Sequence, residues 1–357
     1  MAILPFKILW RFCFVRLDRA VPLKVTRLTS VPPYPYVLKL PSRDKHKIAI
    51  HIYIPTRLRG HYEGAVPVHV DFHGGGFFMG SCLEQAPFCA MIAEKLGRIV
   101  ISVDYRMGPI HKFPAAIHDA EDVVRAVLEP SSPAGTKLRQ SIWKKLGYAT
   151  PPKSSNPQDD GMTTDILDPE RLSLSGFSSG GNLALNLAIS INTDDVNWPS
   201  PLSKYHSQSI PTLLFFPSFD QTILPHERKP LDSLDPEKQA QLMKPSRLGL
   251  SRYLSETYLS PEQRQHPRAS PGKASLSALI PGTMILLVLC EIDSLARQSE
   301  EWVDKVKKEG KAQMVQVEKC DGMRHGWTQF PDFVLSSTEK QEKARVFQQA
   351  VTFLEKF

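Results

Sequence analysis

The sequence lacks the cysteine patterns that mark disulfide frameworks and zinc sites. Its 357 residues contain five cysteines, an odd number, and no two of them have Cys-x-x-Cys spacing. Both classes of protein are therefore disfavoured, and no metal ligands are expected. The sequence also lacks any Asn-x-Ser/Thr acceptor for glycosylation, which favours a cytoplasmic protein over a secreted one.

The chain also has no long apolar run and no block of like charges. Residues 1–17 are apolar, but Lys7, Arg11 and Arg16 interrupt them, so the segment is too broken to span a bilayer or to act as a cleaved signal. It predicts either a peripheral helix on a membrane surface or, with preference, a helix packed over the protein's own pocket. The net charge of +7 is spread along the chain, which argues against nucleic-acid binding.

Strand-like and helix-like segments alternate along the chain. The stretch KIAIHIYI places its isoleucines on one face with the period of a strand, and Ser336 and Glu339 have the spacing of a helix capping box. Strands are expected at 47–54, 66–72, 98–103, 172–174, 212–216, 283–289 and 313–317. Helices are expected at 90–96, 119–128, 183–191, 299–308 and 336–357. Repeated β-α units predict an α/β fold, with a mostly parallel central sheet and helices on both faces.

Two segments interrupt this alternation. Residues 131–165 are rich in proline, serine and lysine, which predicts a surface excursion. Residues 220–270 are polar with scattered aromatic side chains and have no strand pattern, so a helical insertion is expected there.

The heptapeptide GFSSGGN, residues 176–182, follows a short strand and leads directly into an apolar helix. A nucleophile elbow requires this context, because its serine lies on a turn so tight that the neighbouring positions must be small. Gly176 and Gly180 meet that requirement, so Ser178 is predicted to be a nucleophile rather than part of an ordinary Ser/Gly turn. The N–H group of Ser179, at the start of the helix, points to where an oxyanion would form.

A second glycine-rich turn, with the sequence HGGG, directly follows the expected strand at 66–72. Gly74, Gly75 and Gly76 allow the backbone to approach a ligand closely and to turn its N–H groups inward. A phosphate cradle is the alternative, but the Lys-Ser/Thr ending of a phosphate loop is absent. The position upstream of the elbow fits the oxyanion loop of esterases.

A serine hydroxyl needs a base to accept its proton, and imidazole titrates in a suitable range. His325 lies in a glycine-flanked loop between the last expected strand and the last helix. An orienting carboxylate should follow the preceding strand. Asp293 does so, 32 residues before the histidine; Asp220 is the competing acid and Glu291 a weaker neighbour. The chain order Ser, Asp, His favours Asp293.

These motifs resemble those of the hormone-sensitive-lipase-like family of the α/β-hydrolase superfamily. HGGGFFMGS resembles its oxyanion loop and GFSSGGN its elbow, and further matching segments are DYRMGPIHKFPAAIHDA, HPRASP and GMRHGW. The resemblance implies an α/β-hydrolase core of residues 46–217 and 271–357, with 131–165 as a surface insertion. It also implies a helical cap built from residues 1–45 and 218–270.

The same resemblance implies hydrolysis of small-molecule carboxylic esters through an acyl-enzyme, without a cofactor. The implied triad is Ser178, Asp293 and His325. The glycines of HGGG and Ser179 would form the oxyanion hole, with His73 holding that loop in shape. Phe177 departs from the family pattern, since an acidic residue is usual there, so the residue beside the nucleophile is apolar in this chain.

Other functions remain open on the sequence alone. Lactone or amide cleavage, or acyl transfer to another alcohol, would use the same triad. The gibberellin receptors resemble this family but have lost the catalytic histidine, so the fold can also serve recognition. The presence of His325 counts against a receptor, and the oligomeric state is not predicted.

Overall fold

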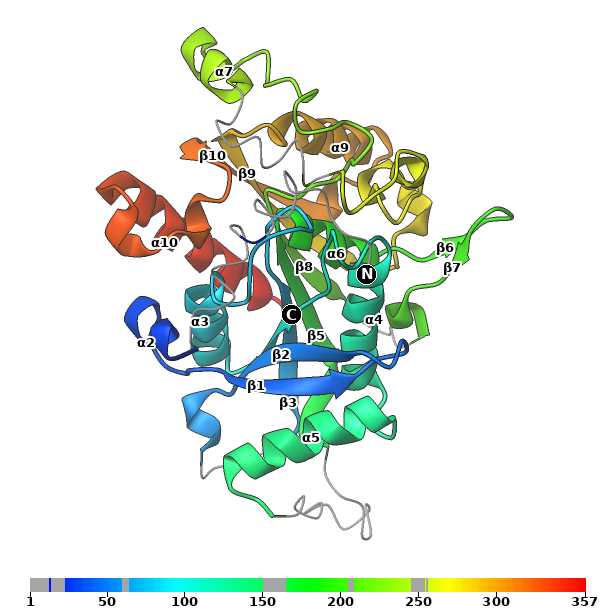
Figure 1. The fold of residues 1–357 in the computed structure, drawn as a ribbon. Helices are drawn as coiled ribbons and strands as arrows, with labels where there is room; N and C mark the ends of the chain where they lie inside the picture. The colour runs from blue at the N-terminus through cyan, green and yellow to red at the C-terminus, as the bar shows by residue number, and fades with distance from the viewer. Residues whose placement is uncertain are drawn as a thin grey trace.

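The computed structural model describes residues 13, 23–59, 64–149, 165–204, 209–244, 254 and 256–357. An eight-stranded sheet with the order β1-β2-β4-β3-β5-β8-β9-β10 dominates this part of the chain, beside a small ribbon of two strands (Figure 1). The sheet strands are β1 (Tyr36–Pro41), β2 (Lys47–Tyr53), β3 (Val66–Phe72), β4 (Ile99–Asp104), β5 (Leu167–Phe177), β8 (Ile210–Phe215), β9 (Thr283–Ile292) and β10 (Val315–Arg324), and the ribbon strands are β6 (Ile191–Asn192) and β7 (Asn197–Trp198). The β1–β2 and β2–β4 pairs are antiparallel, and all later neighbours are parallel. The predicted mostly parallel α/β sheet is confirmed.

Helices cover both faces of this sheet. The described α-helices of four residues or more are α2 (Thr26–Thr29), α3 (Ala86–Leu96), α4 (Ala115–Leu128), α5 (Pro133–Leu146), α6 (Ser179–Leu187), α7 (Pro236–Met243), α9 (Ala296–Lys308) and α10 (Ser337–Leu354). Helices α3 and α10 pack on one face, whereas α4, α5, α6 and α9 contribute to the core on the other (Figure 1).

The sheet has a hydrophobic core on each face, and this explains why several strands are continuous apolar runs in the sequence. In β9, Ile285 and Leu287 are buried in the core under α4 and α6, while Leu286 and Val288 are buried in the core under α3 and α10. Successive side chains of a strand point to opposite faces, so a strand covered on both faces has no polar side.

The edge strand β1 and the helix α5 differ from the expectations. Residues 36–41 fall in the segment assigned to the cap, yet they form the outer strand of the main sheet, and their half-exposed pattern gives little periodic signal. Residues 131–165 were expected to form a surface excursion, but α5 occupies their first half, begins at the side-chain cap of Ser132, and buries Leu138, Ile142 and Trp143 in the core. The sequence of α5 is mostly polar, so its apolar stripe was not recognised from the sequence.

The insertion after β8 is mostly irregular within its described part. Helix α7 is the longest helix among the described residues of the insertion, and Lys238 of α7 pairs with Glu291 at the end of β9 at 3.0 Å. The insertion therefore reaches over the carboxyl ends of the parallel strands. Its described residues do not delimit a cap, so the assignment of residues 218–270, and of residues 1–45 apart from strand β1, to a cap stays a prediction.

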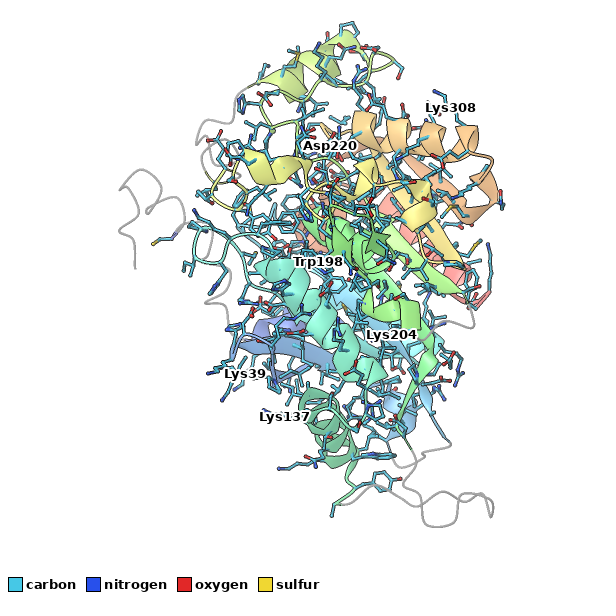
Figure 2. All side chains as sticks on the ribbon, turned by 90° about the vertical axis from the view of Figure 1, so that its right-hand side faces the viewer. Lys39, Lys137, Trp198, Lys204, Asp220 and Lys308 are labelled. Atoms are coloured by element: carbon cyan, nitrogen blue, oxygen red, sulfur yellow. The ribbon has the colours of Figure 1, made fainter. Side chains whose placement is uncertain are left out.

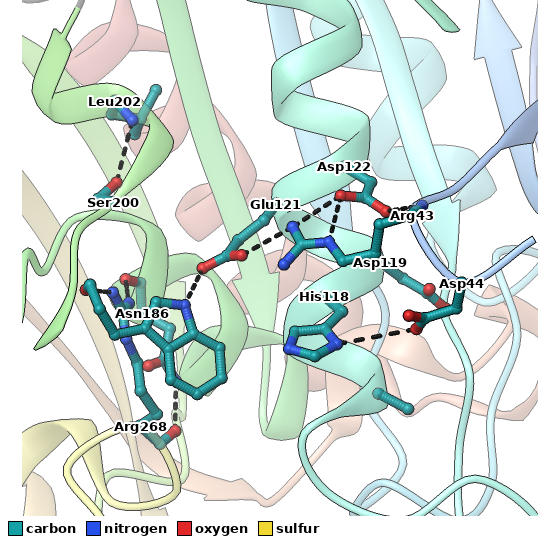
Figure 3. A network of polar contacts seen from close by, with 12 residues as sticks. Arg43, Asp44, His118, Asp119, Glu121, Asp122, Asn186, Ser200, Leu202 and Arg268 are labelled. Carbon is teal, nitrogen blue, oxygen red and sulfur yellow. Dashed lines mark hydrogen bonds and ion pairs between the residues drawn. The ribbon is translucent and has the colours of Figure 1, made fainter. Parts of the chain in front are cut away.

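A charged network ties the β1–β2 turn to α4 (Figure 3). Arg43 binds Glu121 at 2.8 Å and Asp122 at 2.6 Å, and Arg106 binds both Asp44 and Asp119 at 2.8 Å. Because three of these carboxylates lie on one buried helix, the network fixes the antiparallel edge of the sheet against the helical layer.

Cationic side chains are scattered over the described molecule. Lys137 on α5 and Lys308 on α9 lie at opposite ends of the view in Figure 2, with Lys39 and Lys204 between them. None of the described helices has the length and apolar character needed to cross a membrane. The predicted surface or cap helix at residues 1–17 lies outside the described residues apart from Cys13.

Candidate active site

Ser178 lies on the sharp turn between β5 and α6. Its backbone has φ 53° and ψ −112°, values that an L-residue rarely adopts. The turn is possible because two neighbours are glycine: a Cβ on Gly176 would lie 2.1 Å from the carbonyl oxygen of Gly180, and one on Gly180 would lie 2.1 Å from that of Phe72. The local geometry is that of a nucleophile elbow.

The hydroxyl of Ser178 meets a histidine that is bound to a carboxylate. Its Oγ lies 2.9 Å from Nε2 of His325, and Nδ1 of the same ring lies 2.7 Å from Oδ2 of Asp293. A carboxylate can only accept, so Nδ1 donates to it, and Nε2 of the neutral ring is left to accept the serine proton. The side chain of Asp293 is 2% exposed and that of His325 is 37% exposed. The acid is therefore buried, whereas the base is accessible to solvent.

The sheet brings the histidine and the acid together. Strands β9 and β10 are parallel neighbours, with Ile292 in register with Arg324, so the residues that follow them emerge at the same edge. The N–H of His325 also donates to the carbonyl of Ile292 at 3.3 Å. A register shift in β10 after Cys320 sets this alignment.

The competing carboxylates have other partners. Asp220 accepts hydrogen bonds from the N–H of Thr222 at 2.7 Å and from its hydroxyl at 2.5 Å. Glu291 accepts from the N–H of Gly322 at 2.6 Å and pairs with Lys238. Among the three acids considered from the sequence, Asp293 is the one that contacts His325.

The HGGG segment folds into a tight turn beside the elbow. The carbonyl of Gly75 accepts from the N–H groups of Phe78 and Met79 at 3.1 and 3.0 Å, and these two bonds close the turn. Gly75 has φ +118°, and a Cβ there would lie 2.0 Å from the carbonyl oxygen of Met79. Only glycine fits this position.

His73 and Tyr105 pack against this turn and hold it in place. Nδ1 of His73 lies 2.7 Å from the carbonyl oxygen of Gly74, and its ring stacks on Tyr105 with centroids 4.3 Å apart. The hydroxyl of Tyr105 donates to the carbonyl of His73 at 2.8 Å and lies 3.3 Å from Oγ of Ser179. One buried tyrosine therefore joins the glycine turn to the first residue of α6.

A second serine–histidine–aspartate group is buried in the sheet. His69 lies 2.8 Å from Oγ of both Ser173 and Ser175, and the hydroxyl of Ser175 donates to Asp71 at 2.6 Å. All four side chains are 0% exposed, and burial lowers the pKa of His69 to about 3. No substrate can reach this group and its histidine resists protonation, so its role is structural.

An aromatic column supports His325, and sequence reasoning missed it. The ring of Phe216 lies edge-on to His325 with centroids 5.0 Å apart. Behind it, contacts between 4.3 and 6.1 Å link the other rings. The aromatic column consists of Phe88, Phe177, Phe215, Phe216 and Phe347. The apolar pair at the end of TLLFF was the available signal, and the column also explains why an aromatic residue at position 177 is buried where the family has an acid.

Asn182, the last residue of GFSSGGN, also has a structural role that the motif alone did not reveal. Its Nδ2 donates to the carbonyls of Ser218 and Ala269 at 2.9 and 3.0 Å. It thereby ties α6 to both ends of the insertion after β8. Within the described residues, no cluster of three or more His, Cys, Asp or Glu side chains could hold a metal ion.

Known proteins are similar to this chain in sequence and in fold. A family model described as alpha/beta hydrolase fold matches residues 69–329. A probable carboxylesterase 8 of Arabidopsis thaliana is 31% identical over 47% of this chain and 45% of its own length, and an ethyl acetate hydrolase of Pseudomonas putida is 29% identical over 42% and 37%. The matched region thus spans less than half of each relative.

Solved structures extend the likeness to the whole chain. The carboxylesterase EstE1, from a metagenomic library, covers 99% of both chains with a TM-score of 0.66 and 21% identity. A fungal esterase from Rhizomucor miehei covers 100% of this chain and 93% of its own, with a TM-score of 0.67 and 20% identity. At such identities the likeness establishes the fold.

Proposed function

Because the chain belongs to the α/β-hydrolase fold family, in its hormone-sensitive-lipase-like branch, we propose that it hydrolyses small-molecule carboxylic esters. One observation carries the proposal: the continuous hydrogen-bond chain from Ser178 through His325 to Asp293, with links of 2.9 and 2.7 Å. The names of the two relatives, a carboxylesterase and an ethyl acetate hydrolase, support the same class of substrate.

In the first half-reaction, His325 takes the proton of Ser178 as its oxygen attacks the ester carbonyl. Asp293 keeps the imidazole in the required tautomer and stabilises its positive form. The N–H groups of Gly75, Gly76 and Ser179 would hold the oxyanion, with the carbonyl of Gly74 fixed by His73.

The alcohol then leaves with the proton from His325, and the acyl group remains on the serine. Water enters, gives a proton to the same ring, and attacks the acyl-enzyme. The acid departs and the serine hydroxyl is restored, so every proton moves through one histidine.

Ser178→Ala tests this mechanism directly. We expect turnover of p-nitrophenyl acetate to fall by a factor on the order of 10⁴–10⁶, because the nucleophile is lost while binding remains. An unchanged melting temperature would show that the fold is intact, and Ser173→Ala, which alters the buried group instead, is the matched control.

Labelling by a fluorophosphonate separates an enzyme from a receptor. The wild-type serine should react covalently and Ser178→Ala should not, since only a serine activated by a base attacks phosphorus at an appreciable rate. Retained turnover in Ser178→Ala, or absence of labelling in the wild type, contradicts the proposal.

A further inference from the structure

Arg228 lies in the insertion after β8 and has no partner within the described chain. Its Nε is buried without a hydrogen bond, and no carboxylate of the described residues lies within ion-pair distance of its guanidinium. Nε of Arg125 and Nε of Arg268 are buried without a hydrogen bond as well, but two buried arginines have partners for their other nitrogens. Arg268 donates from both terminal nitrogens to the carbonyls of Asn186 and Trp198, and Arg139 binds Asp165 at 2.7 Å.

The loop that carries Arg228 is anchored next to the triad acid. At one end, the N–H groups of Phe219 and Asp220 donate to Oε1 of Gln298 at 2.6 and 2.7 Å. At the other, Nη2 of Arg297 donates to the carbonyl of Pro230 at 2.6 Å. Both anchoring side chains belong to the first turn of α9, which begins three residues after Asp293. Figure 2 shows Asp220 in this region, between α9 and the part of the insertion that contains α7.

Two carboxylates, Asp293 and Asp220, act on Arg228 through their charge, and both already accept hydrogen bonds from other groups. Burial lowers the pKa of Arg228 to about 10, and the charges of Asp293 and Asp220 oppose this effect, so the side chain stays cationic at neutral pH. Asp293 accepts from His325 and from the N–H of Leu295 at 2.8 Å. Asp220 accepts from Thr222. Neither is placed to bind the guanidinium.

A partly buried cation without a hydrogen-bonded anion is destabilising unless a ligand supplies that anion. The planar fork of arginine fits a carboxylate with two parallel hydrogen bonds. We propose that Arg228 binds a free carboxylate of the substrate, so that the preferred substrates are esters that carry a second, unesterified carboxyl group. This inference rests on the proposed ester hydrolysis and specifies its substrate class.

The test compares pairs of esters that differ only in this charge. Mono-p-nitrophenyl adipate carries a carboxylate on the acyl side, and 4-acetoxybenzoate carries one on the alcohol side; the methyl ester of each is its neutral counterpart. We expect the wild type to favour the anionic member of at least one pair in kcat/KM. Arg228→Gln should lower that preference by about 10- to 100-fold, the range of one charge-assisted pair.

Two variants serve as controls for Arg228→Gln. Lys229→Gln removes the same charge from the exposed neighbouring residue, and it should keep the preference. Arg228→Lys keeps the charge but lacks the planar guanidinium with its two parallel donors, so it should keep part of the preference. This variant still tests the proposal if Arg228→Gln folds poorly. Ser178→Ala gives the background rate for every ester.

The possible outcomes distinguish a failure of the role of Arg228 from a failure of the proposed ester hydrolysis. Ester turnover that persists in Ser178→Ala contradicts the proposed hydrolysis itself. Serine-dependent turnover with equal preference in the wild type and Arg228→Gln overturns only the role of Arg228. Equal losses for charged and neutral esters, with a shifted pH profile of kcat/KM, would also overturn it, because Arg228 would then act on Asp293 and His325 through its charge.

Discussion

Replacing Asp293 by asparagine is the sharpest test of the hydrogen-bond chain. In the wild type, Oδ1 accepts from the N–H of Leu295 at 2.8 Å and Oδ2 accepts from Nδ1 of His325 at 2.7 Å. Asparagine can keep the first bond only with its carbonyl oxygen, which turns its NH₂ group towards the ring. Nδ1 must then accept, so the ring proton moves to Nε2 and points at Ser178.

A ring in that tautomer cannot take the serine proton. We therefore expect Asp293→Asn to lower kcat by a factor on the order of 10⁴, equivalent to about 5 kcal/mol of transition-state stabilisation. KM should change little, because Asp293 is 2% exposed and does not reach the substrate. Stopped assays with p-nitrophenyl acetate at neutral pH give both constants.

Asp220→Asn is the matched control. Its oxygen can still accept from Thr222, so its kcat should stay within about tenfold of the wild type. The reasoning is refuted if Asp293→Asn retains more than about a tenth of the wild-type kcat, or if both variants lose activity equally.

Two further predictions concern the fold. Gly180→Ala should lower the free energy of unfolding by at least about 1–3 kcal/mol in urea titrations, because its Cβ would meet the Phe72 carbonyl at 2.1 Å; a variant as stable as the wild type would contradict the close approach of α6 to β3. For Asp71, burial raises the carboxyl pKa from 3.8 to about 6, so the folded state binds the proton more tightly and loses stability as pH rises between these values. At about 1.4 kcal/mol per factor of ten, the ionised form costs about 3 kcal/mol above pH 6. Asp71→Asn lacks this titration, so its stability relative to the wild type should improve by about that amount between pH 4 and pH 7, and a constant difference across this range would show that Asp71 does not titrate there.

The features that sequence reasoning predicted are those encoded in short stretches. The apolar run of β9 and the capping box at Ser336 needed no distant contacts, and the structure confirms both. GFSSGGN combines a strand end, small residues and a helix start, and this local combination is enough to predict the elbow at Ser178.

The features that it did not predict depend on which segments become neighbours. The chain order favoured Asp293 over Asp220, but both residues follow strands, and the physical reason for the choice is the adjacency of β9 and β10, which brings Asp293 to His325. Helix α5 was obscured because its apolar stripe is only visible against a partner. No stretch of sequence indicates that Arg228 lacks a partner, since that property belongs to the surrounding fold.

The aromatic column gives the imidazole of His325 an indirect mechanical support. His325 rests on Phe216, and the rings behind it lead to Phe347 in α10. Through these rings, the packing of α10 on the sheet is connected to the imidazole that lies 2.9 Å from the hydroxyl of Ser178. We therefore expect that substitutions that repack α10, even far from any substrate, change the proton transfer from Ser178 to His325.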